Sequence, residues 1–233
     1  MFLTLLAASA AASAAGLDPA RIQAVAPTLA EQPASFGRPI TDRAAWDALA
    51  KHKAFGSVVR RAEHYLNRPI PDLPADLYLD FSRTGNRSRW QRVAGKRTAR
   101  FRALVLGECV ENKGRFLPAI AAIVRAICAE PTWLMPAHDR SLNNFHGKSI
   151  DIDLRAAHMA FDLATARYLL ADKLPSATRT LIATEVRRRV LDPYRLMATG
   201  KRKANWWTRT TNNWNTVCLA GVTGAALALV EPR

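Results

Sequence analysis

Apolar residues recur at three- and four-residue steps along most of the chain, the spacing that places them on one face of an α-helix. The first such run, Trp46 to Leu66, predicts one helix with Thr41 or Asp42 as its N-cap, ended by the prolines at 69, 71 and 74. The second, third and fourth helices are predicted at about 86–111, 116–130 and 151–171. A fifth helix is expected to begin at a Ser176 cap and to end at Pro193, and a sixth is predicted, after a basic loop, from 213 onward.

Only one short segment has a strand-like pattern, "DLYLDF" from Asp76 to Phe81. Since short turns join the predicted helices, consecutive helices should lie antiparallel. The sequence therefore predicts an all-α chain of helical hairpins. The final helix, "NWNTVCLAGVTGAALALV", has almost no polar face, which is typical of a helix covered on all sides. Because the sequence ends directly after it, at Arg233, we expect a truncated chain with a covering element downstream.

The first fifteen residues have the character of a targeting segment. An apolar run, Phe2–Ala8, is followed by small residues with a possible cleavage site at Ala12–Ala14, but no basic residue precedes the run. We therefore expect a signal peptide at 1–15, a domain at 16–233, and a periplasmic or secreted protein. The alternatives are an Ala-rich N-terminal helix or an artefactual start. No other segment reaches the roughly 18 to 20 apolar residues of a membrane span.

Composition predicts the charge of the binding partner and argues against a metal site and a bound cofactor. The 233 residues include 34 Lys+Arg and 19 Asp+Glu, a formal net charge of +15, which predicts a polyanionic partner without choosing among nucleic acid, polysaccharide and lipid. The three cysteines (Cys109, Cys128, Cys218) have no metal-ligand spacing, which favours buried thiols, with one disulfide as the alternative. No cofactor-binding motif occurs, so we expect neither a cofactor nor a metal.

The strongest candidate site is the stretch "KRKANWWTRTTNNWNT", Lys201–Thr216. Indole faces are platforms for sugar rings or bases, amides hydrogen-bond without charge, and a helix beginning near Asn213 offers free backbone N–H groups to an anion. No Asp or Glu lies between Arg195 and Val230. We interpret the stretch as the floor of a pocket for an anionic ring; the alternative is a hairpin corner filled by tryptophans. Its candidate residues are Trp206, Trp207, Arg209, Asn212, Asn213 and Trp214.

Two other loops hold candidate residues. In "SRTGNR", Arg83 and Arg87 flank a turn, where they would either grip an anion or tie loops together through backbone carbonyls. In "PAHDRSLNNFHG", His138 lies beside Asp139 and eight residues before His146, which suggests acid–base or metal chemistry. Because a loop without a third ligand rarely binds a metal, we favour His138 as a residue that lines the site.

Three blocks together resemble the heparinase II/III-like family of polysaccharide lyases: "YLDFSRTGNRSRW", "EPTWLMPAHDRSLNNFHGKSIDIDL" and "TNNWNTVCLAGVTGAALAL". They come in the family's order and span roughly Leu77–Leu229. The resemblance implies an (α/α) toroid of helical hairpins, normally followed by a β-sandwich region. It also implies an exported enzyme that cleaves a uronate-containing anionic polysaccharide by β-elimination, a partner other than nucleic acid.

In such lyases an amide or cation neutralises the uronate carboxylate, a Tyr or His removes the C5 proton, and a Tyr commonly protonates the leaving oxygen. The resemblance assigns Asn213 to the carboxylate-facing amide. The next residue, a catalytic His in several members, is Trp214 here, and the family's Tyr would lie beyond Arg233. These departures keep a second hypothesis open, a non-catalytic acidic-glycan-binding domain. A third, nucleic-acid binding, rests on charge alone, and no known motif supports it.

Overall fold

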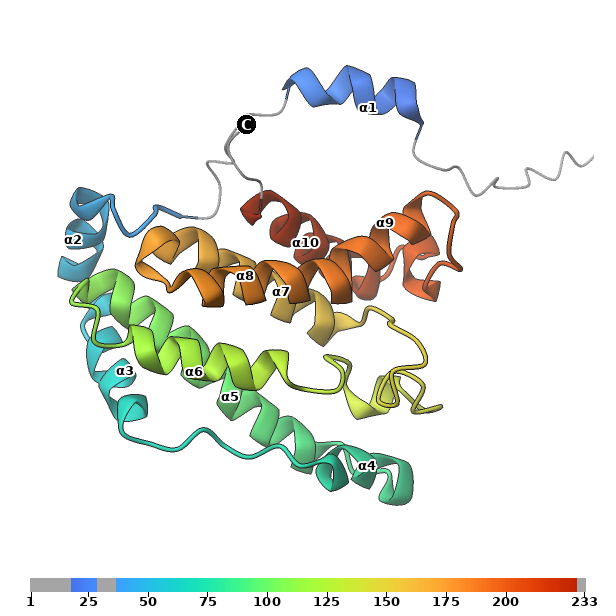
Figure 1. Cartoon of the computed structure of the whole chain (residues 1–233), viewed down its shortest axis with the longest axis horizontal. Helices are drawn as coiled ribbons and strands as arrows, with labels where there is room; N and C mark the ends of the chain where they lie inside the picture. The colour runs from blue at the N-terminus through green and yellow to red at the C-terminus, as the bar shows by residue number, and fades with distance from the viewer. Residues whose placement is uncertain (1–17, 29–36, 230–233) are drawn as a thin grey trace, which may run out of the picture.

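The computed structural model describes residues 18–28 and 37–229, and within these ranges the chain forms helices and no strand, which confirms the all-α prediction (Figure 1). In the same ranges no helix is both long and apolar enough to cross a membrane. The expected signal peptide at 1–15 lies outside the described residues. The helices are α1 Pro19–Val25, α2 Arg43–Lys51, α3 Val58–Leu66, α4 Ala75–Thr84, α5 Ser88–Glu111, α6 Leu117–Cys128, α7 Leu154–Leu170, α8 Ser176–Val186, α9 Asp192–Ala198 and α10 Asn213–Ala228.

Two layers of helices form the body of the molecule (Figure 1). One layer contains α5, α7 and α10, and the other contains α6 and α8, with α3 packed along α5. Short connections make α5 and α6 one antiparallel hairpin and α7 and α8 the next, as the loop lengths predicted. The loops after α6 and after α9 meet at one end of this arrangement, and they build the site described below (Figure 1).

Glycines allow α10 to lie directly against α7. A Cβ at Gly221 would come within 2.6 Å of the Ala157 carbonyl oxygen, and one at Gly224 within 2.6 Å of the Phe161 ring. The buried face of α10 therefore packs on α7 at backbone distance. Small residues on the opposite face are exposed, so no described residue provides the expected covering element, and that element stays a prediction: Thr216, Ala220, Thr223 and Ala226.

The predicted single helix over Trp46–Leu66 is wrong, because the chain forms two helices, α2 and α3, with a short 3-10 turn, η2 (Lys53–Phe55), between them. At His52 the backbone is extended, and the imidazole accepts a hydrogen bond from the Ala54 N–H at 3.3 Å, which begins a new turn. The start of α2 agrees with prediction, since the Asp42 side chain caps it.

The strand-like segment 76–81 is helical and belongs to α4. Leu77 and Phe81 are one helical turn apart, and Tyr78 is buried, stacked on Phe145 at a centroid distance of 4.8 Å and edge-on to Trp90 at 5.7 Å. Gly85, with φ of 72°, ends the helix. Contacts between distant segments thus decide the conformation of a stretch that local alternation misassigns.

Pro193 does not end the fifth helix, contrary to the sequence prediction. A π-helical segment, η5 (Arg187–Leu191), follows α8, the Asp192 N–H donates to the Arg187 carbonyl, and α9 continues through the proline. The wider turn accommodates the missing N–H of proline. The predicted Ser176 cap is also wrong, because Ser176 is the first residue of α8 and Pro175 occupies the N-cap position.

The three cysteines are buried and free, which agrees with the prediction of buried thiols rather than a disulfide. Burial raises the pKa of each thiol, Cys109, Cys128 and Cys218, to about 12. They therefore behave as small apolar residues of the core.

Candidate functional site

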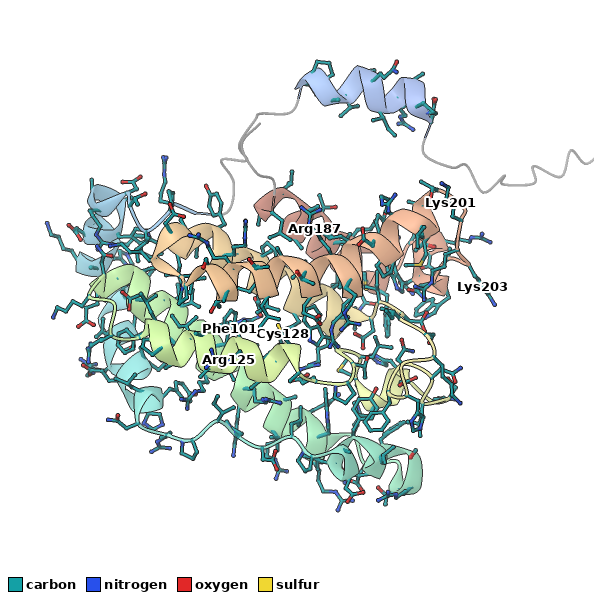
Figure 2. The ribbon with its side chains drawn as sticks, viewed as in Figure 1. Phe101, Arg125, Cys128, Arg187, Lys201 and Lys203 are labelled. Atoms are coloured by element: carbon teal, nitrogen blue, oxygen red, sulfur yellow. The ribbon has the colours of Figure 1, made fainter. Side chains whose placement is uncertain are left out.

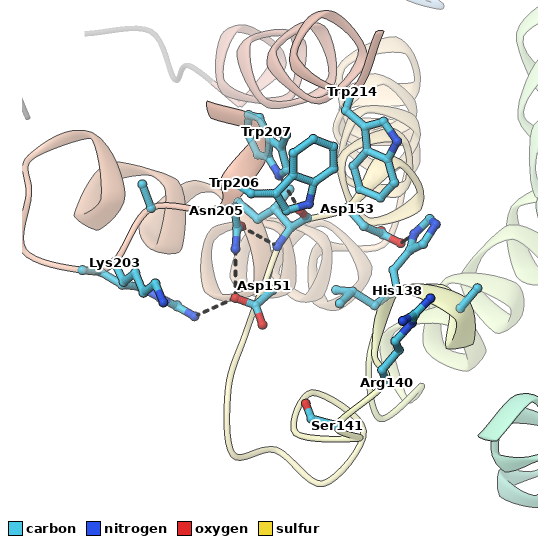
Figure 3. Close-up of a pocket in the computed structure, with 15 residues that line it drawn as sticks. His138, Arg140, Ser141, Asp151, Asp153, Lys203, Asn205, Trp206, Trp207 and Trp214 are labelled. Carbon is cyan, nitrogen blue, oxygen red and sulfur yellow. Dashed lines mark hydrogen bonds and ion pairs between the residues drawn. The ribbon is translucent and has the colours of Figure 1, made fainter. Parts of the chain in front are cut away.

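A cavity of about 760 Å³ lies where the loop 129–153, between α6 and α7, meets the loop 199–212, between α9 and α10 (Figure 3). Two indoles, Trp206 and Trp214, form one wall. His138 and Arg140 face them from the other loop, and the carboxylates of Asp151 and Asp153 lie between the two sides (Figure 3). The two loops together therefore provide aromatic, imidazole, cationic and carboxylate groups.

Capping interactions fix the position of Trp214 at the start of α10. The Asn212 side-chain oxygen accepts from the backbone N–H groups of Trp214 at 3.1 Å and of Asn215 at 3.4 Å. The Asn215 amide in turn donates to the Trp207 carbonyl at 3.1 Å. Since each of these amides satisfies backbone groups at the helix start, they hold the loop and the helix in one geometry.

Trp207 fixes the loop 199–212 to the rest of the domain through a buried indole. Its indole is 1% exposed, and its Nε1–H donates to the Ile152 carbonyl at 2.7 Å. The ring lies parallel to Tyr194, with a centroid distance of 6.3 Å. Because the ring is buried and held by these contacts, Trp207 has a structural role in fixing the loop that lines the cavity.

Trp206 differs from Trp207 because its ring stays accessible. It is 55% exposed, and its centroid lies 5.0 Å from that of Trp214 at an interplanar angle of 50°. An indole held in place yet open on one face is suited to stack on a planar or ring-shaped ligand. Trp214 continues this aromatic surface toward His138, whose ring centroid is 4.5 Å from its own.

The His138 imidazole is oriented by a buried carboxylate. Its Nδ1 lies 2.7 Å from Oδ2 of Asp153, whose side chain is 3% exposed. Asp153 also accepts from the backbone N–H of Met135 at 2.9 Å and of Ala156 at 2.8 Å, the second as the N-cap of α7. A carboxylate held by these two backbone donors fixes the ring and favours a proton on Nδ1.

Asp151 joins the two loops. It accepts from Asn144 at 2.8 Å, from Ser149 at 3.2 Å and from Asn205 at 3.0 Å. Burial alone would raise the pKa of this carboxyl, but these hydrogen bonds and the nearby Arg202 outweigh burial, so the pKa is lowered and Asp151 is ionised near neutral pH. Since the 201–216 stretch has no acid of its own, its sequence pattern did not reveal that Asp151 and Asp153 would lie under it.

Uncompensated positive charge lies at the rim of the cavity. Arg140 and Lys203 are exposed and form no ion pair with any residue in the described ranges. Lys201 and Lys203 lie at the outer edge of the loop after α9 (Figure 2). Arg202, by contrast, donates to the Ile150 carbonyl and lies 3.6 Å from Asp151. The cavity thus combines three cationic side chains with two carboxylates that protein donors already satisfy.

The structure brings three of the predicted site residues, His138, Trp206 and Trp214, together around the cavity. Trp207 contacts it from its buried position. The remaining candidates of the stretch, Arg209, Asn212 and Asn213, do not line it. Asn213 is the exposed first residue of α10, Asn212 is its cap and Arg209 is exposed on the short 3-10 turn η6, Trp206–Arg209.

Arg83 and Arg87 do not line the cavity either. Arg83 is exposed at the end of α4 and pairs with Asp76 at 3.2 Å, and Arg87 is exposed immediately before α5. An anion grip by this pair therefore stays a separate prediction that the cavity does not include.

The sequence neighbours His138 and Asp139 point to different partners. Asp139 is 2% exposed and accepts from Tyr78 at 3.2 Å and from the Phe145 N–H at 2.8 Å, so it organises the loop. Burial, together with the Asp139 charge, raises the pKa of Tyr78 well above its ordinary value. Across residues 18–28 and 37–229, no cluster of three or more His, Cys, Asp or Glu side chains is arranged to hold a metal ion.

Comparison with models of known protein families and with curated protein sequences found no match for the chain. The resemblance to heparinase II/III-like lyases therefore stays a prediction that rests on the three sequence blocks.

Proposed function

We propose that the chain is the helical part of an exported polysaccharide lyase that cleaves a uronate-containing polymer by β-elimination. In this proposal the hairpins α5–α6 and α7–α8 belong to an (α/α) toroid. The observation that supports it most is the composition of the cavity. The accessible indole of Trp206, the imidazole of His138 held by a carboxylate, and cationic side chains without an ion-pair partner among the described residues lie together there. The three sequence blocks that resemble the lyase family contain most of the residues of this cavity.

The proposed chemistry needs local positive potential beside a sugar ring. A pyranose stacked on Trp206 would place its C6 carboxylate near the rim, within reach of Arg140 or Lys203. Neutralising that carboxylate makes the C5 proton more acidic, since negative charge develops on the carboxylate when the proton leaves. The cavity keeps an excess of positive charge, because its lining holds three cationic side chains, Arg140, Arg202 and Lys203, against the two carboxylates.

Hydrolysis by two carboxyl groups fits the cavity less well, although Asp151 and Asp153 both line it. Glycoside hydrolysis needs one carboxyl with a raised pKa to protonate the leaving oxygen. The pKa of Asp151 is lowered, which makes this carboxyl unsuited to the acid role. Asp153 is engaged by the backbone N–H groups of Met135 and Ala156 and by Nδ1 of His138, so it has no oxygen free to face a leaving group. Elimination is therefore the better-supported reaction.

The test is an assay for the new C4–C5 double bond. The full-length protein would be incubated with heparan sulfate, chondroitin, hyaluronan and alginate, and the ultraviolet absorbance of unsaturated products would be followed. The proposal predicts a gain with at least one polymer and none with the same polymer after its carboxyl groups are reduced to alcohols. No gain with any of the four, or an equal gain with the reduced polymer, would contradict it.

A second function, binding of an acidic glycan without cleavage, is favoured by two features of the cavity lining. Asn213, the family's carboxylate-facing amide, does not line the cavity, and none of the described lining residues is a tyrosine. Binding alone would be supported if the dissociation constant falls as the carboxylate content of the polymer rises and no product forms over a long incubation.

A further inference from the structure

We propose that His138 is the base that removes the C5 proton in this cavity, with Asp153 as its positioning residue, an assignment that rests on the proposed lyase function. The resemblance places a catalytic histidine at the position of Trp214, which cannot accept a proton. The imidazole of His138 lies beside that position on another loop, since its ring contacts Trp214 at a centroid distance of 4.5 Å.

The geometry leaves one ring nitrogen of His138 for a ligand. Nδ1 is taken by Asp153 at 2.7 Å, and Nε2 has no hydrogen-bond partner among the described residues. The side chain is 17% exposed and lines the cavity opposite Trp206 (Figure 3). With the proton held on Nδ1, Nε2 carries the lone pair, so the tautomer required of a base is the one that Asp153 selects.

The neighbours of the ring also suit the charge that proton transfer creates. When Nε2 takes a proton, the ring becomes an imidazolium between a carboxylate and an indole face, and both stabilise a cation. Because Asp153 is fixed by Met135 and Ala156, it does not have to move during the reaction.

The proposed step balances without any further reagent. The C5 proton moves to Nε2 of His138, the C5–H electron pair becomes the C4–C5 double bond, and the C4–O bond breaks. The leaving alkoxide takes a proton from solvent water, and the imidazolium then returns its proton to the hydroxide that remains. The products are an unsaturated uronate at one new end and a free hydroxyl at the other.

The other histidines near this region do not share this arrangement. His146 lies on the exposed side of the loop, edge-on to Phe145. His158 is exposed on α7 and lines a separate groove of about 590 Å³ between α5 and α7, beside Asp162. His158 is therefore a matched control, an exposed histidine outside the cavity.

The experiment compares His138→Gln with His158→Gln on the polymer that the wild type cleaves best. Loss of a general base lowers turnover about 10² to 10⁴-fold. We expect such a loss for His138→Gln, with polymer affinity within about threefold of the wild type, and no loss for His158→Gln. His138→Ala should also lose turnover and regain at least tenfold when free imidazole is added, because imidazole can occupy the space beside Asp153.

The possible failures are distinguishable. If the wild type binds polymers but releases no unsaturated product, the lyase function fails and this assignment fails with it. If the wild type is active and His138→Gln retains its turnover, only the assignment is overturned. Equal loss of affinity and turnover, or absence of imidazole rescue in a His138→Ala protein with an unchanged circular dichroism spectrum, would also overturn it.

Discussion

Removal of the Asn205 amide, Asn205→Ala, tests how the two loops of the cavity are held together. Its oxygen accepts from the Ile152 N–H at 3.0 Å, and its nitrogen donates to Asp151 at 3.0 Å. A neutral hydrogen bond contributes about 1 kcal/mol and one to a charged group about 1.5 to 3 kcal/mol. Since the Asp151 side chain is 37% exposed and water replaces part of the loss, we expect about 2 to 3 kcal/mol.

The measurement is thermal unfolding followed by circular dichroism. For a chain of this size, 1 kcal/mol corresponds to about 2 to 4 °C in Tm, so Asn205→Ala should lower Tm by about 4 to 12 °C. Asn213→Ala is the matched control, because that amide is exposed at the first position of α10. It should change the free energy of unfolding by less than about 0.5 kcal/mol.

The reasoning would be refuted if the two variants lost equal stability, or if Asn205→Ala matched the wild type. Equal losses would mean that position in the loop, rather than the two hydrogen bonds, determines the contribution of the amide. The same pair also separates stability from function. If Asn213 has the role that the resemblance assigns to it, Asn213→Ala should lose far more turnover than stability; if the cavity, which Asn213 does not line, is the site, the variant should keep both.

Two other perturbations follow from the same contacts. Gly221→Ala should destabilise the protein by about 1 to 3 kcal/mol, because its Cβ would meet the Ala157 carbonyl oxygen at 2.6 Å. Gly95→Ala should stabilise α5 by up to about 1 kcal/mol, because a Cβ there meets nothing within 4 Å. Urea unfolding measures both changes. The lowered pKa of Asp151 means that its contribution is complete above about pH 4 and is lost as the pH falls through the lower folded-state pKa. The wild type should therefore lose stability relative to Asp151→Asn in that acidic window, and parallel stability curves would contradict this.

The helical fold could be predicted from the sequence because apolar periodicity and helix-capping residues are local signals. The bounds of α5, α7 and α10 agree with prediction within about three residues. The failures occurred where distant contacts override local pattern. Tyr78 is helical because it packs on Trp90 and Phe145, and Pro193 is accommodated by a π turn that no local rule anticipates.

The site was predictable in part for the same reason. An indole pair beside cations is visible in the stretch 201–216, and Trp206 and Trp214 do line the cavity. The acids were not visible there, because Asp151 and Asp153 come from a loop about fifty residues earlier. The pairing of His138 with Asp153 was hidden as well, since sequence adjacency pointed to Asp139, which faces Tyr78 instead.

The most direct test of the central claim, that the indole wall of this cavity receives an acidic sugar, is the affinity of a Trp206→Ala variant for a uronate oligosaccharide. Isothermal titration should show binding about tenfold weaker than wild type, equivalent to about 1.4 kcal/mol of stacking and buried area. Tm should stay unchanged, because the ring is 55% exposed. Leu106→Ala, an exposed apolar residue of α5 outside the cavity, should bind as the wild type does. Wild-type affinity in Trp206→Ala would contradict the account.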